Sequence, residues 1–280
     1  MIRFPVQAGY FYAGSASALK KQIEECFLHR FGPGKLPHVE EGPRRIVSLI
    51  SPHAGYVYSG PVAANGYYLA AQDGRPDTIV VIGPNHTGYG SGVSIMVGGT
   101  WRMPLGDVEV DAELARGVQR SSELIDIDEM GHKFEHSVEV QLPFLQYVYG
   151  SDFKIIPICM MIQDLETSRD VGEAIAKAFS GKNVLIVAST DMSHYEPHRS
   201  AEAKDRLAID AILKLDAREL QSTVESKGIS MCGYGPVSAA IIASKKLGAT
   251  QVQLLSYRTS GDITGDRSQV VGYASLAITK

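Results

Sequence analysis

Cysteine is scarce in this sequence, with only Cys26, Cys159 and Cys232 among 280 residues. A set this sparse, and odd in number, does not form the disulfide framework of a small secreted domain. No apolar run approaches the roughly 18 residues that a membrane-spanning helix needs. The first residues, MIRFPVQAGYFYAG, also lack the continuous apolar segment of a signal peptide. These absences predict a cytoplasmic protein with reduced thiols and no membrane contact.

Concentrated positive charge and nucleotide-binding motifs are missing as well. The net charge of −4 is spread along the chain without a block of lysine and arginine, which a nucleic-acid-binding face would need. The glycines match neither a phosphate loop nor a dinucleotide fingerprint. We therefore expect no nucleic-acid partner. The 44% hydrophobic and 21% charged residues that are present are typical of a globular protein with a substantial core.

Apolar runs alternate with helical patterns along the whole chain. The expected strands are 46–50, 78–82, 92–98, 153–160, 183–189, 251–257 and 269–278. The expected helices are 15–30, 111–120, 132–147, 165–179, 199–215, 219–227 and 237–246. A further helix is expected with Pro61 in its first turn, and the pattern over 132–147 is interrupted at Pro143. The lone Trp101 is expected in a connecting region. This alternation predicts one α/β domain over 1–280, with a central, mostly parallel sheet flanked by helices and mixed edges near the C-terminal hairpin.

Three of the apolar strands end in a histidine. His53 follows the first strand within SPHAGYVYSG, where Pro52 ends the strand and Gly55 allows a tight turn. His86 and His194 follow two later strands in the same way. Because the carboxyl ends of parallel strands lie on one side of a sheet, the three imidazoles are expected to converge there. Imidazole is a ligand for zinc, copper and iron, so the pattern favours a metal site over three separate loop-shaping hydrogen bonds.

Two further residues near these strand ends carry reactive groups. Asp191 lies three residues before His194, where a carboxylate can orient a general base or simply cap a turn. Cys232, in the glycine-rich turn MCGYGP before a helix, is either a thiolate of lowered pKa or a small buried residue. The residues alone leave these alternatives open. Cys26 and Cys159 are assigned to packing.

The stretch HKFEHSVEVQ contains several other polar side chains. His132 and His136 are four residues apart, but they lack the glutamate placement of a metalloprotease helix. His194 and His198 have the same spacing, but Pro197 between them argues against a regular helix, so neither pair predicts a zinc protease. Glu135, His136 and Glu139 either line the crevice, as substrate contacts or as groups that support the ligands, or form a solvated helix start. Both interpretations remain open at this point.

Six segments together resemble the Memo family, also called AmmeMemoRadiSam system protein B. They are SPHAGYVYSG, GPNHTGYG, EHSVEVQLPFLQ, STDMSHY, MCGYGPV and SYRTSGD. The resemblance implies a fold similar to that of the class III extradiol ring-cleaving dioxygenases, which use non-haem iron. It further implies metal ligands at His53, His86 and Cys232, with Asp191 and His194 as the neighbouring catalytic pair. It also implies a pathway link to radical-SAM and AMMECR-type proteins.

The third ligand implied by the resemblance differs from that of the dioxygenases. A thiolate replaces their carboxylate, and this softer ligand favours copper or changes the redox behaviour of iron, with zinc ranked lower. We therefore expect a metal-dependent redox enzyme that acts on a small-molecule or peptide ligand in the crevice, with Glu135 and His136 as substrate contacts. The alternatives are a non-catalytic module that binds a (phospho)peptide or other ligand, and metal-assisted hydrolysis.

Overall fold

Four apolar segments form the centre of the sheet in this computed structural model, which describes all residues from 1 to 280. β2 (Ile46–Ser51), β3 (Thr78–Pro84), β8 (Lys154–Met160) and β9 (Val184–Ser189) lie in the order β8-β3-β9-β2, and all run parallel. Almost every residue in them is buried, because helices cover both faces of the sheet. This explains why these strands are continuous apolar runs rather than alternating ones.

The edges of the sheet are mixed. β12 (Val270–Thr279) pairs antiparallel with β2, and β11 (Gln251–Thr259) pairs antiparallel with β12, which confirms the predicted mixed edge at the C-terminal hairpin. On the other side β6 (Gly106–Val110) is parallel to β8. The remaining strands are β1 (Ile2–Arg3), β4 (Val93–Ile95), β5 (Thr100–Met103), β7 (Asp126–Ile127) and β10 (His194–Glu196).

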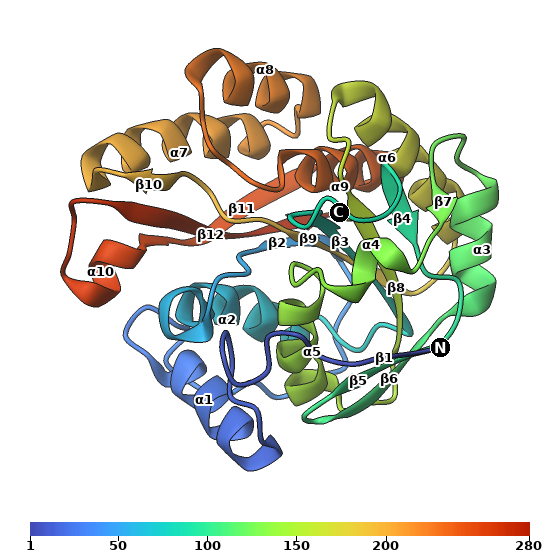
Figure 1. Cartoon of the computed structure of the whole chain (residues 1–280), viewed down its shortest axis with the longest axis horizontal. Helices are drawn as coiled ribbons and strands as arrows, with labels where there is room; N and C mark the ends of the chain where they lie inside the picture. Colours follow the sequence, from blue (N-terminus) through green and yellow to red (C-terminus); the bar gives the residue numbers. More distant parts are fainter.

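The helices cover the two faces of the sheet in separate groups (Figure 1). The longer helices are α1 (Ala16–Leu28), α2 (Tyr56–Gln72), α3 (Ala112–Arg120), α5 (Leu142–Tyr149), α6 (Leu165–Phe179), α7 (His198–Leu213), α8 (Ala217–Lys227) and α9 (Tyr234–Lys246). Three short ones are α4 (Met130–Lys133), the 3-10 helix η1 (Glu139–Gln141) and α10 (Ser260–Thr264). α1, α2 and α5 pack together on one face, whereas α9 lies across β2, β3 and β9 on the other and contacts α6 and α8.

One hydrophobic core of 69 buried residues runs through the chain from Tyr12 to Ile278. The predicted fold class, a single α/β domain with a mostly parallel sheet between helices, is confirmed. No helix is both long enough and apolar enough to cross a membrane.

Three local predictions are wrong. α2 begins at Tyr56, so Pro61 lies inside the helix rather than in its first turn. The helix starts early because its first turn is anchored, with the backbone N–H of Tyr56 bonded to the carbonyl of Phe11. Packing of the buried side chains of α2 outweighs the one backbone hydrogen bond that the proline removes. Trp101 lies in β5, not in a connection, and the Arg3 guanidinium covers its ring at 4.3 Å.

The third wrong prediction is the helix over 132–147. The chain instead forms α4, an irregular stretch at 134–138, η1 and α5. The backbone N–H groups of His136 and Ser137 donate to the Glu135 carboxylate, and this local arrangement replaces a helical turn. Pro143 does not interrupt a helix, because it occupies the first turn of α5, where proline is well tolerated.

Candidate metal centre

Three neighbouring strands carry the predicted histidines. In the sheet order β3-β9-β2, His86 follows β3, His194 follows β9 and His53 follows β2. Cys232 reaches the same place from the start of α9, the helix that packs across these strands. The ligand atoms of His53, His86 and Cys232 all lie within 4.8 Å of one another. Two of the three imidazoles predicted to converge, those of His53 and His86, are therefore in this cluster, whereas His194 lines the same crevice outside it.

His53 is buried and held by both its backbone and its ring. The backbone N–H of His53 donates to Oδ1 of Asp191 at 2.8 Å. The ring nitrogen Nδ1 lies 2.8 Å from the hydroxyl of Ser189. Nε2 of the same ring lies 3.3 Å from Sγ of Cys232. Burial, followed by the neighbouring imidazoles of His136, His86 and His194, lowers the pKa of His53 well below its usual value. The ring is therefore neutral, as a metal ligand must be.

Gly55 does not have the role predicted for it in this motif. Its φ of −56° is open to any residue, and an added Cβ would meet nothing closer than 3.6 Å. Gly55 is the residue that precedes the first turn of α2. The rigidity of the motif comes from the hydrogen bonds of His53 rather than from a glycine turn.

His86 is oriented by Glu135. Its side chain is 34% exposed, and its Nδ1 lies 2.9 Å from Oε1 of Glu135, while its backbone N–H donates to Oε2. Burial by itself would raise the pKa of Glu135, but the hydrogen bond from His86 and the charges of His136 and His86 lower it to about 2. The ionised carboxylate keeps the proton of His86 on Nδ1, which leaves Nε2 free for a metal.

Glu135 is buried and occupied by neighbouring N–H groups rather than exposed to a ligand. Its two oxygens accept from the N–H groups of His86, His136 and Ser137 as well as from the His86 ring. Of the two predicted substrate contacts, only His136 lies on the crevice wall, stacked on His86 with a centroid separation of 4.6 Å. Glu135 therefore supports the ligand His86, which was one of the two roles considered for it. The group formed by His86, Glu135 and His136 is explained by these hydrogen bonds without a second metal.

Cys232 lies half-buried against β9. Its Sγ accepts the N–H of Asp191 at 3.2 Å. The next residue must be glycine, because a Cβ on Gly233 would lie 2.5 Å from the carbonyl oxygen of Ser189. Burial, and then the Asp191 carboxylate, raise the pKa of the Cys232 thiol. The prediction that its position before a helix lowers the pKa of Cys232 is therefore wrong for the metal-free protein. A metal ion that binds the sulfur would have to displace its proton.

His194 is not oriented by Asp191, which corrects that part of the prediction. The ring nitrogen Nδ1 of His194 lies 2.8 Å from the carbonyl of Ser230. The backbone N–H of His194 donates to the Ser230 hydroxyl at 2.7 Å. Asp191 instead accepts from His53, and burial raises its pKa to about 6. A carbonyl only accepts, so Nδ1 of His194 carries a proton and Nε2 has the lone pair of a base.

Several predicted alternatives lie outside this cluster. His132 is buried beside Trp101 with Nε2 3.1 Å from the carbonyl of Ser94, so it does not pair with His136. α7 begins at His198, and His194 is therefore not on that helix. Glu139 is fully buried and accepts hydrogen bonds from Arg3, Val6, Gln7 and Tyr12, which hold the N-terminal segment in place.

The cluster opens into a crevice of about 760 Å³. Its walls carry five aromatic side chains, namely Tyr10, Phe11, Tyr58, Tyr195 and Tyr273. His53, His86, His136, Asp191 and His194 also line it, and neither lysine nor arginine does. Tyr10 and Phe11 come from the N-terminal segment, for which no functional role was predicted. Ser189, Gln141 and Ser230, which contact the histidines or their partners, were also missed, although polar residues within apolar stretches are a recognisable sign.

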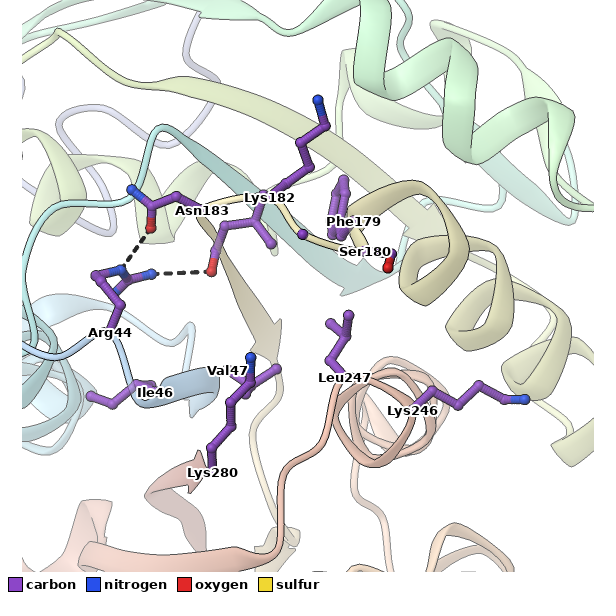
Figure 2. Close-up of a pocket in the computed structure, with 12 residues that line it drawn as sticks. Arg44, Ile46, Val47, Phe179, Ser180, Lys182, Asn183, Lys246, Leu247 and Lys280 are labelled. Atoms are coloured by element: carbon purple, nitrogen blue, oxygen red, sulfur yellow. Dashed lines mark hydrogen bonds between the residues drawn. The ribbon is translucent and has the colours of Figure 1, made fainter.

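A second cavity, of about 450 Å³, lies at the opposite end of the strands (Figure 2). It is basic, with Arg44, Lys182, Lys246 and Lys280 on its wall. The Arg44 guanidinium is already bonded to Oδ1 of Asn183 and the carbonyl of Val184, and Lys246 pairs with Glu173. Arg44 and Lys246 are therefore engaged within the protein, and we assign no ligand to the cavity.

The donor set of the first cavity fits a metal ion. His53 and His86 both present Nε2, because Nδ1 of each is engaged by a partner behind it. Cys232 adds a sulfur within reach of both. Two imidazoles and one thiol are a ligand set for copper, iron or zinc.

The model of the family described as Memo-like protein matches residues 3–277. A MEMO1 family protein of Methanopyrus kandleri is 49% identical, with 100% of both chains covered, and one of Methanothermobacter thermautotrophicus is 52% identical over 99% of this chain and 100% of its own. An uncharacterized protein of Escherichia coli K12 has a similar fold, with a TM-score of 0.53 and 13% identity over 83% of this chain and 99% of its own.

Proposed function

The chain belongs to the Memo-like protein family, and on that premise we propose that it is a metal-dependent redox enzyme with iron or copper held by His53, His86 and Cys232. The observation that carries this proposal is the approach of two imidazole nitrogens and one sulfur to within 4.8 Å, with both imidazoles on the wall of an open crevice. Such a metal would supply one-electron redox chemistry and activation of O₂.

The chain's own residues would provide ligand orientation and proton transfer. Glu135 holds His86 with its Nε2 free, and Ser189 does the same for His53. His194 lines the crevice, and its Nε2 has no hydrogen-bond partner in the protein, so it can accept a proton from a bound substrate. Asp191 faces the same space, and with a pKa of about 6 it is mostly ionised at neutral pH, so it can accept a second proton there.

Elemental analysis of protein purified without oxygen tests this proposal. We expect iron or copper in near-stoichiometric amount in the unaltered chain, and loss of that metal in Cys232→Ser and His53→Ala. Cys26→Ala is the matched control, because it removes a buried thiol of α1 that lies outside the cluster. A chain that stays metal-free after anaerobic reconstitution with Fe(II) and with Cu(I) would contradict the proposal.

A second candidate function is ligand binding without catalysis. It is favoured by the exposed aromatic side chains on the crevice wall, Tyr10 at 87% and Tyr195 at 72% exposure, because exposed aromatics commonly contact partners. The lack of lysine and arginine on the wall favours an uncharged peptide or small molecule over a phosphorylated one. Peptide binding that persists after metal chelation would support this function.

A further inference from the structure

Behind His53 lies a row of buried polar groups whose donor and acceptor roles are all determined. We infer that Ser189 and Gln141 act as positioning residues that keep the proton of His53 on Nδ1, so that Nε2 presents its lone pair toward Cys232. This inference rests on the proposed metal site, because it assigns a tautomer that a ligand at Nε2 requires.

The first step concerns the amide of Gln141. Its Nε2 lies 3.0 Å from the carbonyl oxygen of Pro52 and 2.8 Å from the hydroxyl of Ser189. A carbonyl oxygen only accepts, so the amide nitrogen and not the amide oxygen must face Pro52. The Tyr67 hydroxyl donates to the other end of the amide, Oε1, which agrees with the same orientation. Gln141 therefore donates one hydrogen bond to Ser189.

The second step concerns the hydroxyl of Ser189. Its Oγ lies 2.6 Å from the carbonyl oxygen of Ser137, another group that only accepts. The single hydroxyl hydrogen must point there, because otherwise two oxygen lone pairs would face each other at that distance. With one lone pair used by Gln141, the Ser189 oxygen has one acceptor position left.

The third step assigns the ring. Nδ1 of His53 lies 2.8 Å from Oγ of Ser189, which has only this one acceptor position left. Nδ1 must therefore be the donor and must carry the proton. The neutral ring then has its lone pair on Nε2, 3.3 Å from Sγ of Cys232. All of these groups are buried, so water cannot substitute for a lost partner. The tautomer is thus set by Ser189, whose donor and acceptor roles are determined by Gln141 and the carbonyl of Ser137.

The experiment that tests this relay measures the tautomer of His53 in the metal-free protein by ¹⁵N NMR. The His53 signals are assigned by their loss in His53→Asn. We expect a protonated, pyrrole-type Nδ1 and an unprotonated, pyridine-type Nε2 in the unaltered chain. A protonated Nε2 would overturn the inference, whatever the metal content of the protein. The expected tautomer in a protein that binds no metal would support the relay and contradict the proposed metal site.

Variants separate positioning from general stability. In Ser189→Ala, Nδ1 loses its acceptor, so we expect the Nε2-protonated tautomer to increase and metal affinity to fall about 10- to 100-fold. Gln141→Met, which fills the same space without a donor, should shift the tautomer in the same direction by less. Ser189→Thr keeps the hydroxyl and should restore both readouts. Ser238→Ala is the matched control, since it removes a buried hydroxyl of α9 that has no partner. An unchanged tautomer and affinity in a folded Ser189→Ala variant would overturn the inference.

Discussion

Sγ of Cys232 lies 3.3 Å from Nε2 of His53, although the two residues are 179 positions apart in the chain. Burial raises the pKa of the Cys232 thiol, so the sulfur is protonated in the metal-free protein. It can therefore donate to the lone pair on Nε2. A proton then lies between the two atoms that are proposed to share a metal ion, and binding of the metal must remove it.

The first prediction concerns proton release on metal binding. His53 is neutral because its pKa is lowered, and Asp191, with a pKa of about 6, is already ionised above neutral pH. Between about pH 7 and pH 9 the Cys232 thiol, whose pKa is raised, is thus the group that gives up a proton when the metal binds. The apparent affinity for the metal should therefore rise about tenfold per pH unit over this range. Calorimetry in buffers of different ionisation enthalpy should find about one proton released per metal. Affinity that is independent of pH in this range would contradict the prediction.

The second prediction concerns the carboxylate behind His86. Glu135→Gln removes the charge that favours the Nδ1 proton of His86, while its amide keeps a similar volume. We expect the dissociation constant for the metal to rise about 10- to 100-fold, measured by competition with a chelator. Glu123→Gln, an exposed carboxylate away from the cluster, should leave the constant unchanged. Equal constants in both variants would show that Glu135 does not support the ligand.

The third prediction concerns the stability cost of Asp191. Its pKa is raised to about 6 by burial, so folding disfavours the ionised form. When folding raises the pKa of a carboxyl group, the stability is fully present below the pKa of the unfolded chain. It is lost as the pH rises through the pKa of the folded protein. Asp191→Asn should therefore stabilise the metal-free protein by about 2 to 3 kcal/mol near pH 8, and by roughly half as much near pH 5.

Urea unfolding of both proteins at the two pH values measures this difference. Asp126→Asn, at an exposed position in β7, is the control and should change stability little at either pH. A variant less stable than the parent near pH 8 would mean that the hydrogen bond from His53 outweighs the cost of burying the charge.

The fourth prediction concerns the anchoring of the N-terminal segment. Glu139 pairs with the buried Arg3 and also accepts from Val6, Gln7 and Tyr12. Glu139→Ala leaves the Arg3 charge buried without its partner, so we expect a loss of about 3 to 5 kcal/mol in unfolding free energy. Tyr12→Phe, which removes only one of these bonds, should cost about 1 kcal/mol. Chemical denaturation measures both, and equal losses would show that the ion pair is not the dominant contact.

Much of the fold follows from the sequence because its central strands are buried on both faces. The runs at 46–50, 78–82 and 183–189 need no tertiary information to be recognised, and the histidine after each one marks the edge of the sheet where a ligand can bind. Helix boundaries such as Leu165–Phe179 were also predictable, since Asp164 caps the helix locally. These features depend on residues that are close in sequence.

The tertiary structure decided what each side chain contacts. The sequence placed Asp191 beside His194, but the fold brings Ser230 to that ring and leaves Asp191 for His53. The pKa of Cys232 could not be inferred from its position before a helix, because the surrounding sheet and the Asp191 carboxylate raise it. Periodicity and spacing describe a strand and its end. Hydrogen bonds between residues such as Gln141 and Ser189, 48 positions apart, form only when β9 and η1 pack together.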